Sequence, residues 1–257
     1  MSDILSHVED GVMTLTFNRV DKKNSITRAM YTALADGLEQ AAGDAAVRVV
    51  VIQGDPTVFS AGNDIADFQS APADPGPRDE QPVWRFLKAI AVFPKPLIAA
   101  VCGPAVGVGT TLLLHCDLVY AGDNVAFAMP FVNLGLVPEA ASSLLLPQMF
   151  GYHRAAEALL MGDPFMAEAA LEVGLANRVV PPTECNAYAQ QQARKLAAKP
   201  LSALIESKRL LKGSQQEAVL ARMNEEGDIF NRMLHEPAAR EAMTAFMEKR
   251  KPDFSNC

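Results

Sequence analysis

The sequence lacks the excess of positive charge that a nucleic-acid-binding protein carries. Its 257 residues include 23 Lys and Arg against 30 Asp and Glu, which gives a net charge of −7 at pH 7. Binding to a phosphate backbone requires a basic face, so we expect no nucleic-acid partner. A local basic pocket for a small phosphate-bearing ligand stays compatible with this composition.

Cysteine and histidine are scarce, with four of each, and neither type forms a cluster. The cysteines are Cys102, Cys116, Cys185 and Cys257. No pair has the spacing of a metal site, so we predict small buried hydrophobic residues in a reducing compartment. His115 ends an apolar stretch, where a core position or a helix C-terminal turn fits better than metal ligation.

Membrane-spanning and targeting segments are also missing from the sequence. No apolar run reaches the roughly 20 residues that a transmembrane helix needs. Residues 1–4 do not begin a signal peptide, and residues 254–257 are not a peroxisomal address. We therefore expect a cytoplasmic protein with no membrane partner.

The motifs of three common enzyme classes are absent. Gly107 and Gly109 are followed by Leu112, where the third glycine of a dinucleotide-binding loop would stand. There is no Gly-Lys-Ser/Thr of a phosphate-binding loop and no Gly-x-Ser-x-Gly of a serine hydrolase. Hydride transfer, nucleotide hydrolysis and serine hydrolysis therefore lose their usual sequence support.

The patterns that are present indicate an α/β fold. Hydrophobic residues make up 49% of the chain, which is enough to build a large core. Apolar segments predict strands at residues 11–17, 47–52, 97–102 and 118–121. Met30, Leu34 and Leu38 predict an amphipathic helix that ends near Gly43. Strands that alternate with helices in this way indicate crossover connections.

The last third of the chain is predicted to be helical. Helical patterns cover residues 184–198, 200–212, 214–235 and 238–250. Their apolar residues are too many for an isolated helix, so we expect packing onto the body of the protein or onto another subunit. Earlier in the chain, four prolines within residues 70–82 predict a loop without regular structure. This loop is either a solvated connector or a mobile flap beside a site.

Two turns that contain glycine are candidates for a polarising site. The turn at 103–109 leads into an apolar helix, whose first backbone N–H groups have no intrahelical acceptor. Residues 58–65 follow a strand, and an N–H just past Gly62 can donate to a ligand oxygen. The same segment also fits an ordinary strand-to-helix turn with Asp64 as the helix cap. Asp67 is read as a solvated helix charge and Asp117 as part of a turn.

Glu139 is a lone carboxylate in the apolar segment 130–143. Its spacing alone leaves two interpretations open. After Pro138, Glu139 fits the first turn of a helix, where it stabilises the helix dipole. Its apolar neighbours, Phe131 and Leu136 among them, favour instead a buried base whose pKa lies above the reference of about 4.3. Both roles can hold together.

Short motifs follow one another in order along the chain. They lie at residues 18–19, 24–25, 59–65, 95–96, 100–109, 116–117, 134–135, 138–139, 174–175, 179–180 and 245–249. Together they resemble the enoyl-CoA hydratase/isomerase (crotonase) superfamily along nearly the full length. The resemblance implies an α/β fold with a crotonase-like ββα spiral core. It implies an acyl-CoA-binding catalytic domain at residues 1–195 and a helical C-terminal oligomerisation region at residues 196–257.

The resemblance also implies roles for individual residues. The backbone N–H groups of Asn63 and Val108 form an oxyanion hole that holds the thioester oxygen while an enolate forms. The implied substrate- and CoA-binding residues are Lys23, Asn24, Ala61, Gly62, Asp64, Ile65, Gly107, Phe131, Phe246 and Lys249. Phe246 and Lys249 match residues that close over the nucleotide end in relatives, from the same or a neighbouring subunit. Lys22 and Lys23 also fit solvated surface charges, and this interpretation is favoured for Lys22.

The departures from the family pattern favour one subclass. Hydratases of the family use two glutamates, at positions where this chain has Thr111 and Phe131, so two-carboxylate hydration is not supported. Glu139 instead matches the catalytic glutamate of Δ3,Δ2-enoyl-CoA isomerases. The resemblance thus implies a single-base isomerase that converts 3-enoyl-CoA thioesters to trans-2-enoyl-CoA. It implies no metal or redox cofactor, coenzyme A as part of the substrate, and a homotrimer or homohexamer.

Two alternatives stay open at this stage. Another acyl-CoA reaction of the same fold, such as hydration, ring isomerisation or hydrolysis, can use the same oxyanion hole with another base. A chain of this fold can also be a catalytically silent acyl-CoA binder or an RNA-binding protein, although the acidic composition disfavours RNA. Turnover assays with several acyl-CoA thioesters separate these alternatives.

Overall fold

A six-stranded sheet forms the centre of the computed structural model, which describes residues 2–69 and 76–257. The strands, in spatial order, are β1 (Ile4–Glu9), β2 (Val12–Phe17), β3 (Val49–Gln53), β4 (Leu97–Val101), β6 (Leu118–Gly122) and β9 (Arg178–Val180). β1 pairs antiparallel with β2, and every other neighbouring pair is parallel. The four predicted strands are confirmed, whereas β1 and β9 were not predicted.

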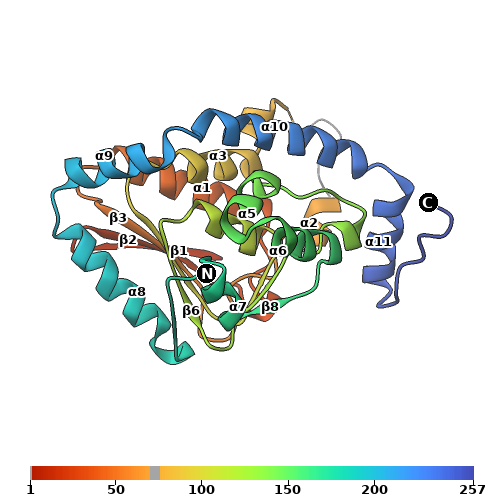
Figure 1. Ribbon diagram of the computed structural model, residues 1–257, viewed down its shortest axis with the longest axis horizontal. Coiled ribbons are helices and arrows are strands. Elements are labelled where there is room, and N and C mark those ends of the chain that lie inside the picture. Colours follow the sequence, from red (N-terminus) through yellow and green to blue (C-terminus); the bar gives the residue numbers. More distant parts are fainter. Residues whose placement is uncertain (1, 70–75) are drawn as a thin grey trace.

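Helices cover both faces of this sheet (Figure 1). α1 (Arg28–Gly43) and α3 (Pro82–Val92) pack against each other over one face, and α8 (Pro182–Ala197) packs on the other. The residues of β3 alternate between two hydrophobic cores, so the strand is apolar on both sides. This explains the continuous apolar run at this strand, which is typical of a parallel strand buried on both faces.

A second, three-stranded sheet lies beyond the glycine turn. It consists of β5 (Pro104–Val106), β7 (Ala126–Ala128) and β8 (Phe165–Met166). These strands have two or three residues each, which is too short to produce a recognisable alternation in the sequence. They anchor the turn that precedes α4 (Val108–Thr111), because β5 leads directly into that helix.

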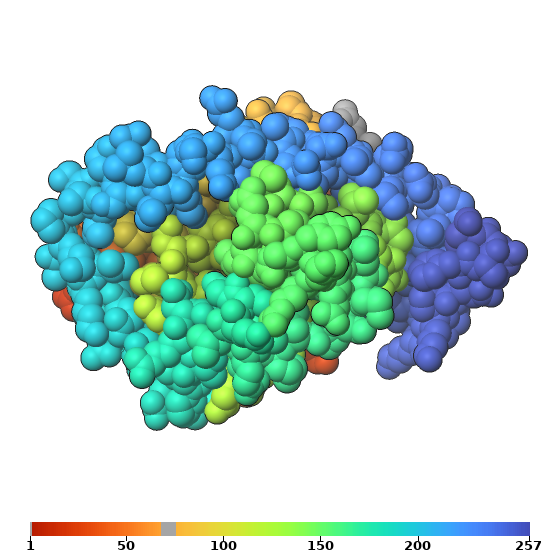
Figure 2. All heavy atoms as spheres, viewed as in Figure 1, coloured from red at the N-terminus to blue at the C-terminus, as the bar shows by residue number. Residues whose placement is uncertain are grey.

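The remaining helices lie before, between and after the strands of the second sheet in chain order. They are α2 (Ile65–Gln69), α5 (Ser142–Phe150), α6 (Tyr152–Ala156), α7 (Ala167–Glu172), α9 (Leu201–Lys212), α10 (Gln216–Met233) and α11 (Pro237–Met247). The four helices predicted in the last third are confirmed as α8 to α11. α10 packs against α3 and α5. α11 and the residues after it form a lobe at one end of the molecule (Figure 2).

The expectation of a loop at residues 70–82 was wrong for its described part. Residues 76–82 are not a loop without regular structure, because Arg78–Glu80 form a 3-10 turn and Pro82 is the first residue of α3. Proline fits that position because the first N–H of a helix needs no intrahelical acceptor. Residues 70–75 of the same predicted loop lie outside the described residues. The predicted helix after the glycine turn is present as α4, which passes after four residues into the 3-10 turn Leu112–His115.

No helix within the described ranges has both the length and the hydrophobicity to cross a membrane. Of the cysteines, Cys102 and Cys185 are buried as predicted, whereas Cys257 is exposed.

Candidate active site

Hydrogen bonds join the turn after β3 to strand β5. The N–H groups of Phe59 and Ser60 donate to the Pro104 carbonyl at 3.2 and 3.0 Å, and the Val106 N–H donates back to the Ser60 carbonyl at 2.9 Å. Gly62 then turns with φ +85°, and a Cβ there would lie 2.7 Å from the Val106 carbonyl oxygen. Only glycine fits this close approach without strain.

Asn63 and Val108 each follow one of two neighbouring glycines, because a Cβ on Gly62 would lie 3.9 Å from the Gly107 Cα. Val108 is the first residue of α4, after Gly107 with φ +55°, so its N–H has no intrahelical acceptor. The Asn63 N–H likewise donates to no acceptor in the described part of the chain. Two free N–H groups on neighbouring rigid turns are what an oxyanion hole requires.

Asn24 supports the turn after β3 through hydrogen bonds. Its side chain is fully buried and donates to the carbonyls of Val58 and Phe59 at 3.2 and 3.1 Å, while its Oδ1 accepts from the Arg19 N–H at 2.8 Å. Its own carbonyl accepts the Ser60 hydroxyl at 2.9 Å. The expectation that Asn24 contacts the ligand is therefore corrected, because its polar groups are all used to hold the turn.

Asp64 caps α2 and anchors it to the N-terminal segment. Its carboxylate accepts from the Asp67 N–H at 3.0 Å, from Arg19 at 2.7 Å and from Ser25 at 3.0 Å. Burial alone would raise the pKa of Asp64, but these hydrogen bonds outweigh it and lower the pKa. The cap interpretation is confirmed, and this carboxylate is not free for a ligand. Asp67 is not a purely solvated charge, because it accepts from the Arg28 N–H at 2.9 Å.

Glu139 lies in the loop before α5 and is 8% exposed. Its Oε1 has no hydrogen-bond partner among the described residues. Burial, and secondarily the charge of Glu226, raises the pKa of Glu139 to about 8. The side chain is thus a buried carboxyl group that holds its proton near neutral pH and accepts one readily.

The interpretation of Glu139 as a helix-start residue is wrong. α5 begins at Ser142, and the two residues between them, Ala140 and Ala141, have φ values of +60° and +56°. A right-handed helix cannot continue through residues with left-handed backbone angles, so Glu139 is not in the first turn of α5. Pro138 therefore does not start a helix either.

Glu139 and Asn63 line the same pocket. Its described lining residues are Asn63, Arg78, Gln81, Val83, Trp84, Leu87, Glu139, Ala140, Met223, Gly227, Phe230 and Asn231. Glu139 is the only carboxylate among these described residues, and the other side chains are mostly apolar or aromatic. A groove on the α8 side of the sheet, lined among others by His7, Thr14 and Gln190, contains none of the predicted site residues.

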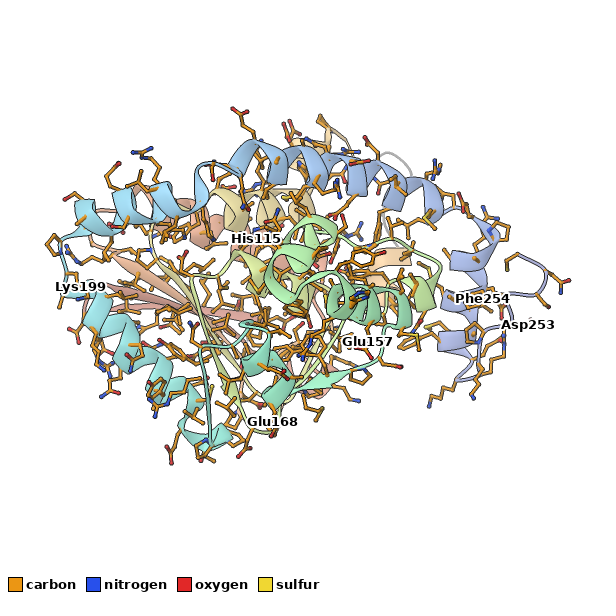
Figure 3. All side chains as sticks on the ribbon, in the orientation of Figure 1. His115, Glu157, Glu168, Lys199, Asp253 and Phe254 are labelled. Atoms are coloured by element: carbon orange, nitrogen blue, oxygen red, sulfur yellow. The ribbon has the colours of Figure 1, made fainter. Side chains whose placement is uncertain are left out.

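Three further residues support the pocket, although nothing in the sequence linked them to it. Tyr31 on α1 is buried and donates to Asn63 Oδ1 at 2.5 Å. His115 bonds through Nε2 to the Ala140 carbonyl at 2.8 Å, and burial lowers its pKa to about 4, so the neutral ring acts as the donor. It lies in the interior in Figure 3. Glu226 on α10 is buried beside the Glu139 loop. They are 32, 25 and 85 residues from their partners in sequence, so no local pattern links them.

The other predicted residues differ in their burial and in their position relative to the pocket. Phe131 is a core side chain at 5% exposure, and Lys23 is exposed with φ +53°. Phe246 is 60% exposed on α11, and neither it nor Lys249 lines the pocket of the same chain. Thr111 is fully buried, and its Oγ1 has no partner in the described ranges.

Among the side chains that the structure describes, no cluster of three or more His, Cys, Asp or Glu residues could hold a metal ion.

Comparison with known proteins identifies a family and several relatives of this chain. Residues 7–256 match the family profile described as enoyl-CoA hydratase/isomerase. The chain is 37% identical over 260 residues to the 1,2-epoxyphenylacetyl-CoA isomerase of Escherichia coli (strain K12), with 99% of both chains covered. It is 37% identical over 226 residues to enoyl-CoA delta isomerase 2 of Rattus norvegicus, which covers 87% of this chain and 57% of that protein. The crystal structure of an enoyl-CoA hydratase/isomerase from Pseudoalteromonas atlantica T6c superposes with a TM-score of 0.94 at 40% identity, over 99% of this chain and 100% of that chain.

Proposed function

Because this chain belongs to the enoyl-CoA hydratase/isomerase (crotonase) family, whose members act on acyl-CoA thioesters, we propose that it moves the double bond of 3-enoyl-CoA thioesters to give trans-2-enoyl-CoA. The observation that carries the proposal is one buried carboxylate, Glu139, in a pocket that contains no other carboxylate among its described residues. The similarity to enoyl-CoA delta isomerase 2 of Rattus norvegicus supports this reaction class, whereas the Escherichia coli relative is named for the isomerisation of an epoxide.

The reaction starts when the thioester oxygen binds between the N–H groups of Asn63 and Val108. These donors stabilise negative charge on that oxygen and so acidify the proton on carbon 2. The ionised Glu139 carboxylate removes this proton, and the electron pair spreads over a dienolate. The neutral Glu139 then returns the proton to carbon 4, which places the double bond between carbons 2 and 3 and restores the carboxylate.

The properties of Glu139 suit both halves of this cycle. A pKa of about 8 makes it a stronger base than an ordinary carboxylate and still lets it give the proton back. Hydration needs a second group to activate or orient water, and Thr111 and Phe131 offer no carboxylate for that step. The apolar walls, Trp84 and Leu87 among them, exclude water from the dienolate.

The proposal needs no metal or redox cofactor, because the thioester and the two N–H donors provide the polarisation. Coenzyme A enters with the substrate. We assign its contacts to the turn around Gly62 and Ile65, with Ala61, Gly107 and Lys23 nearby. Phe246 and Lys249 stay candidates for closing over the nucleotide end from a neighbouring copy in a homotrimer or homohexamer.

The test is conversion of trans-3-hexenoyl-CoA to its conjugated isomer, measured by the absorbance of the enoyl thioester. We expect the wild type to convert it and Glu139→Gln to lose about three orders of magnitude in kcat while still binding the substrate, since general base catalysis supplies about 10²–10⁴-fold. The exposed residue Glu168 offers the matched control Glu168→Gln, which should keep full activity.

The outcomes separate the alternatives within the family. Equal activity in the wild type and Glu139→Gln would remove Glu139 from the mechanism. Tight acyl-CoA binding without isomerisation, but with turnover of 2-enoyl-CoA in water or of an epoxide-bearing aryl acyl-CoA, would replace the proposal by hydration or ring isomerisation. Binding without any turnover would identify a silent acyl-CoA binder.

A further inference from the structure

Glu226 is a second buried glutamate beside the pocket, at 4% exposure on α10. Its Oε2 accepts from the Ala141 N–H at 2.6 Å. Its Oε1 accepts from the Ser143 N–H at 3.0 Å and from the Ser143 hydroxyl at 2.5 Å. All three bonds use the carboxyl group as an acceptor, which is the pattern of an ionised carboxylate.

The segment that Glu226 holds is the one that carries Glu139. Ala140 and Ala141 both have left-handed backbone angles, which alanine adopts only when its surroundings impose them. Successive N–H groups that point to one side of such a turn form a cavity for an anion, and the Glu226 carboxylate occupies it. His115 and Ser142 bind only the carbonyls of this segment, those of Ala140 and Glu139.

We infer that Glu226 is a positioning residue of the reaction: its carboxylate holds the Glu139–Ser143 segment in its left-handed conformation and keeps a second negative charge beside the base. The inference rests on the proposed role of Glu139 as the base. Glu226 does not line the pocket, so it acts through Glu139 and not on the substrate.

The charge of Glu226 also affects how Glu139 titrates. Burial is the larger cause of the raised pKa of Glu139, and repulsion from Glu226 is the second. Among the residues that the structure describes, the other titratable or charged groups near this pair include Tyr31 on α1, Arg78 in the pocket wall, His115 in the 3-10 turn and Arg222 on α10. Burial raises the pKa of Glu226, and Arg222, which donates to the Ser143 hydroxyl at 3.1 Å, acts in the opposite direction and favours the charged form.

Two substitutions separate the two parts of this role. Glu226→Gln keeps the size of the side chain but removes the charge, and Glu226→Asp keeps the charge but shortens the reach. For Glu226→Gln we expect kcat to fall about 10–100-fold, because a base displaced by about 1 Å can lose that much. The pH midpoint of kcat/KM should fall by about one pH unit, since a like charge nearby is removed. KM for the acyl-CoA should stay within about twofold.

Glu226→Asp should lose kcat to a similar extent while its pH midpoint stays within a few tenths of the wild type. The matched control is Glu217→Gln, an exposed glutamate on the same helix, for which we expect no change in any of these quantities. A merely structural role would lower activity only in proportion to the folded fraction, which circular dichroism measures, and would leave the pH midpoint unchanged.

The failure of this inference can be distinguished from the failure of the proposed function. The Glu139 carboxyl carbon is followed by ¹³C NMR in parallel, in the wild type and both variants. If the wild type isomerises 3-enoyl-CoA but neither the kinetics nor the NMR midpoint differs in Glu226→Gln, the inference is wrong. If the wild type lacks isomerase activity, the proposed function is wrong, and the NMR midpoint alone decides the influence of Glu226. If Glu226→Gln does not fold, an unchanged kcat in a folded Glu226→Asp overturns the inference.

Discussion

The buried carboxyl group of Glu139 makes the stability of the folded protein depend on pH in a way that Glu139→Gln should remove. The pKa of Glu139 rises from its ordinary value of 4.5 to about 8 in the folded state. A carboxyl group with a raised pKa binds its proton more tightly in the folded than in the unfolded chain. Its contribution to stability is therefore fully present below pH 4.5 and is lost as the pH rises through 8.

The size of this effect follows from the two pKa values. At 1.36 kcal/mol per pH unit, the rise from 4.5 to about 8 corresponds to about 5 kcal/mol, which is the upper limit because local opening of the pocket relieves part of it. Glutamine has nearly the same shape and no charge. We therefore expect Glu139→Gln to unfold with nearly the same free energy as the wild type at pH 4.5, and to exceed it by up to about 5 kcal/mol at pH 9.

The assay is urea unfolding of both proteins at pH 4.5, 6, 7.5 and 9, with Glu168→Gln as the control for loss of an exposed glutamate. Glu226 also has a raised pKa, caused by burial, but it is present in both proteins and its contribution largely cancels from the difference. A difference between wild type and Glu139→Gln that stays constant from pH 4.5 to 9 would refute the reasoning. It would mean that Glu139 is ionised in the folded state at ordinary carboxyl pH.

Four further outcomes are expected. The wild-type kcat/KM should rise about tenfold per pH unit toward a plateau above about pH 8, because the free enzyme must lose the Glu139 proton before it can act as a base. A kcat/KM that stays constant between about pH 6 and 9 would contradict this. Gly62→Ala places a Cβ 2.7 Å from the Val106 carbonyl oxygen at a φ of +85°. We expect kcat to fall about 10²–10³-fold, because one N–H donor of the oxyanion hole is displaced. The control is Gly43→Ala, because nothing lies within 4 Å of a Cβ at that position. Tyr31→Phe removes the donor to Asn63 Oδ1 and should lower kcat about tenfold, the worth of about 1.4 kcal/mol, at a folded fraction equal to the wild type by circular dichroism. Lys95→Met leaves the carbonyls of Ala41, Asp44 and Val47 without their buried ammonium donor, so urea unfolding should show a loss of about 2–4 kcal/mol while kcat stays unchanged.

The sequence predicted the elements whose patterns are local. The predicted strand 47–52 contains the apolar run 49–52, and the strand 97–102 is apolar throughout. α1 has its apolar residues at helical spacing, and Thr27 caps it, since the Thr27 hydroxyl accepts from the Met30 N–H. The short strands β5, β7 and β8 could not be predicted, because three residues are too few to show a period. Their existence depends on pairing between segments that are about 20 to 40 residues apart in the chain.

The site divides in the same way. The glycine turns and the lone Glu139 were visible in the sequence, because a turn that needs glycine and a carboxylate among apolar residues are both local features. The sequence did not link Tyr31, His115 or Glu226 to the site, and Asn24 was given a ligand role that its buried hydrogen bonds contradict. What they have in common is a partner that is distant in sequence, so only the folded chain identifies them.

The same distance explains why Glu139 sits outside a helix. Local propensity favours Pro138 and Glu139 as the start of one, since proline at the first position and an acidic residue beside it both stabilise a helix. The structure instead turns the chain through Ala140 and Ala141 and starts α5 three residues later. That choice is unfavourable locally and is compensated by Glu226 and His115, which bind the N–H and carbonyl groups that the turn exposes. A helix start would have placed the Glu139 carboxylate near free N–H groups, which lower a pKa. The turn keeps the Glu139 carboxylate away from these N–H groups. The tertiary contacts that hold the turn therefore keep the pKa of Glu139 higher than a helix start would allow.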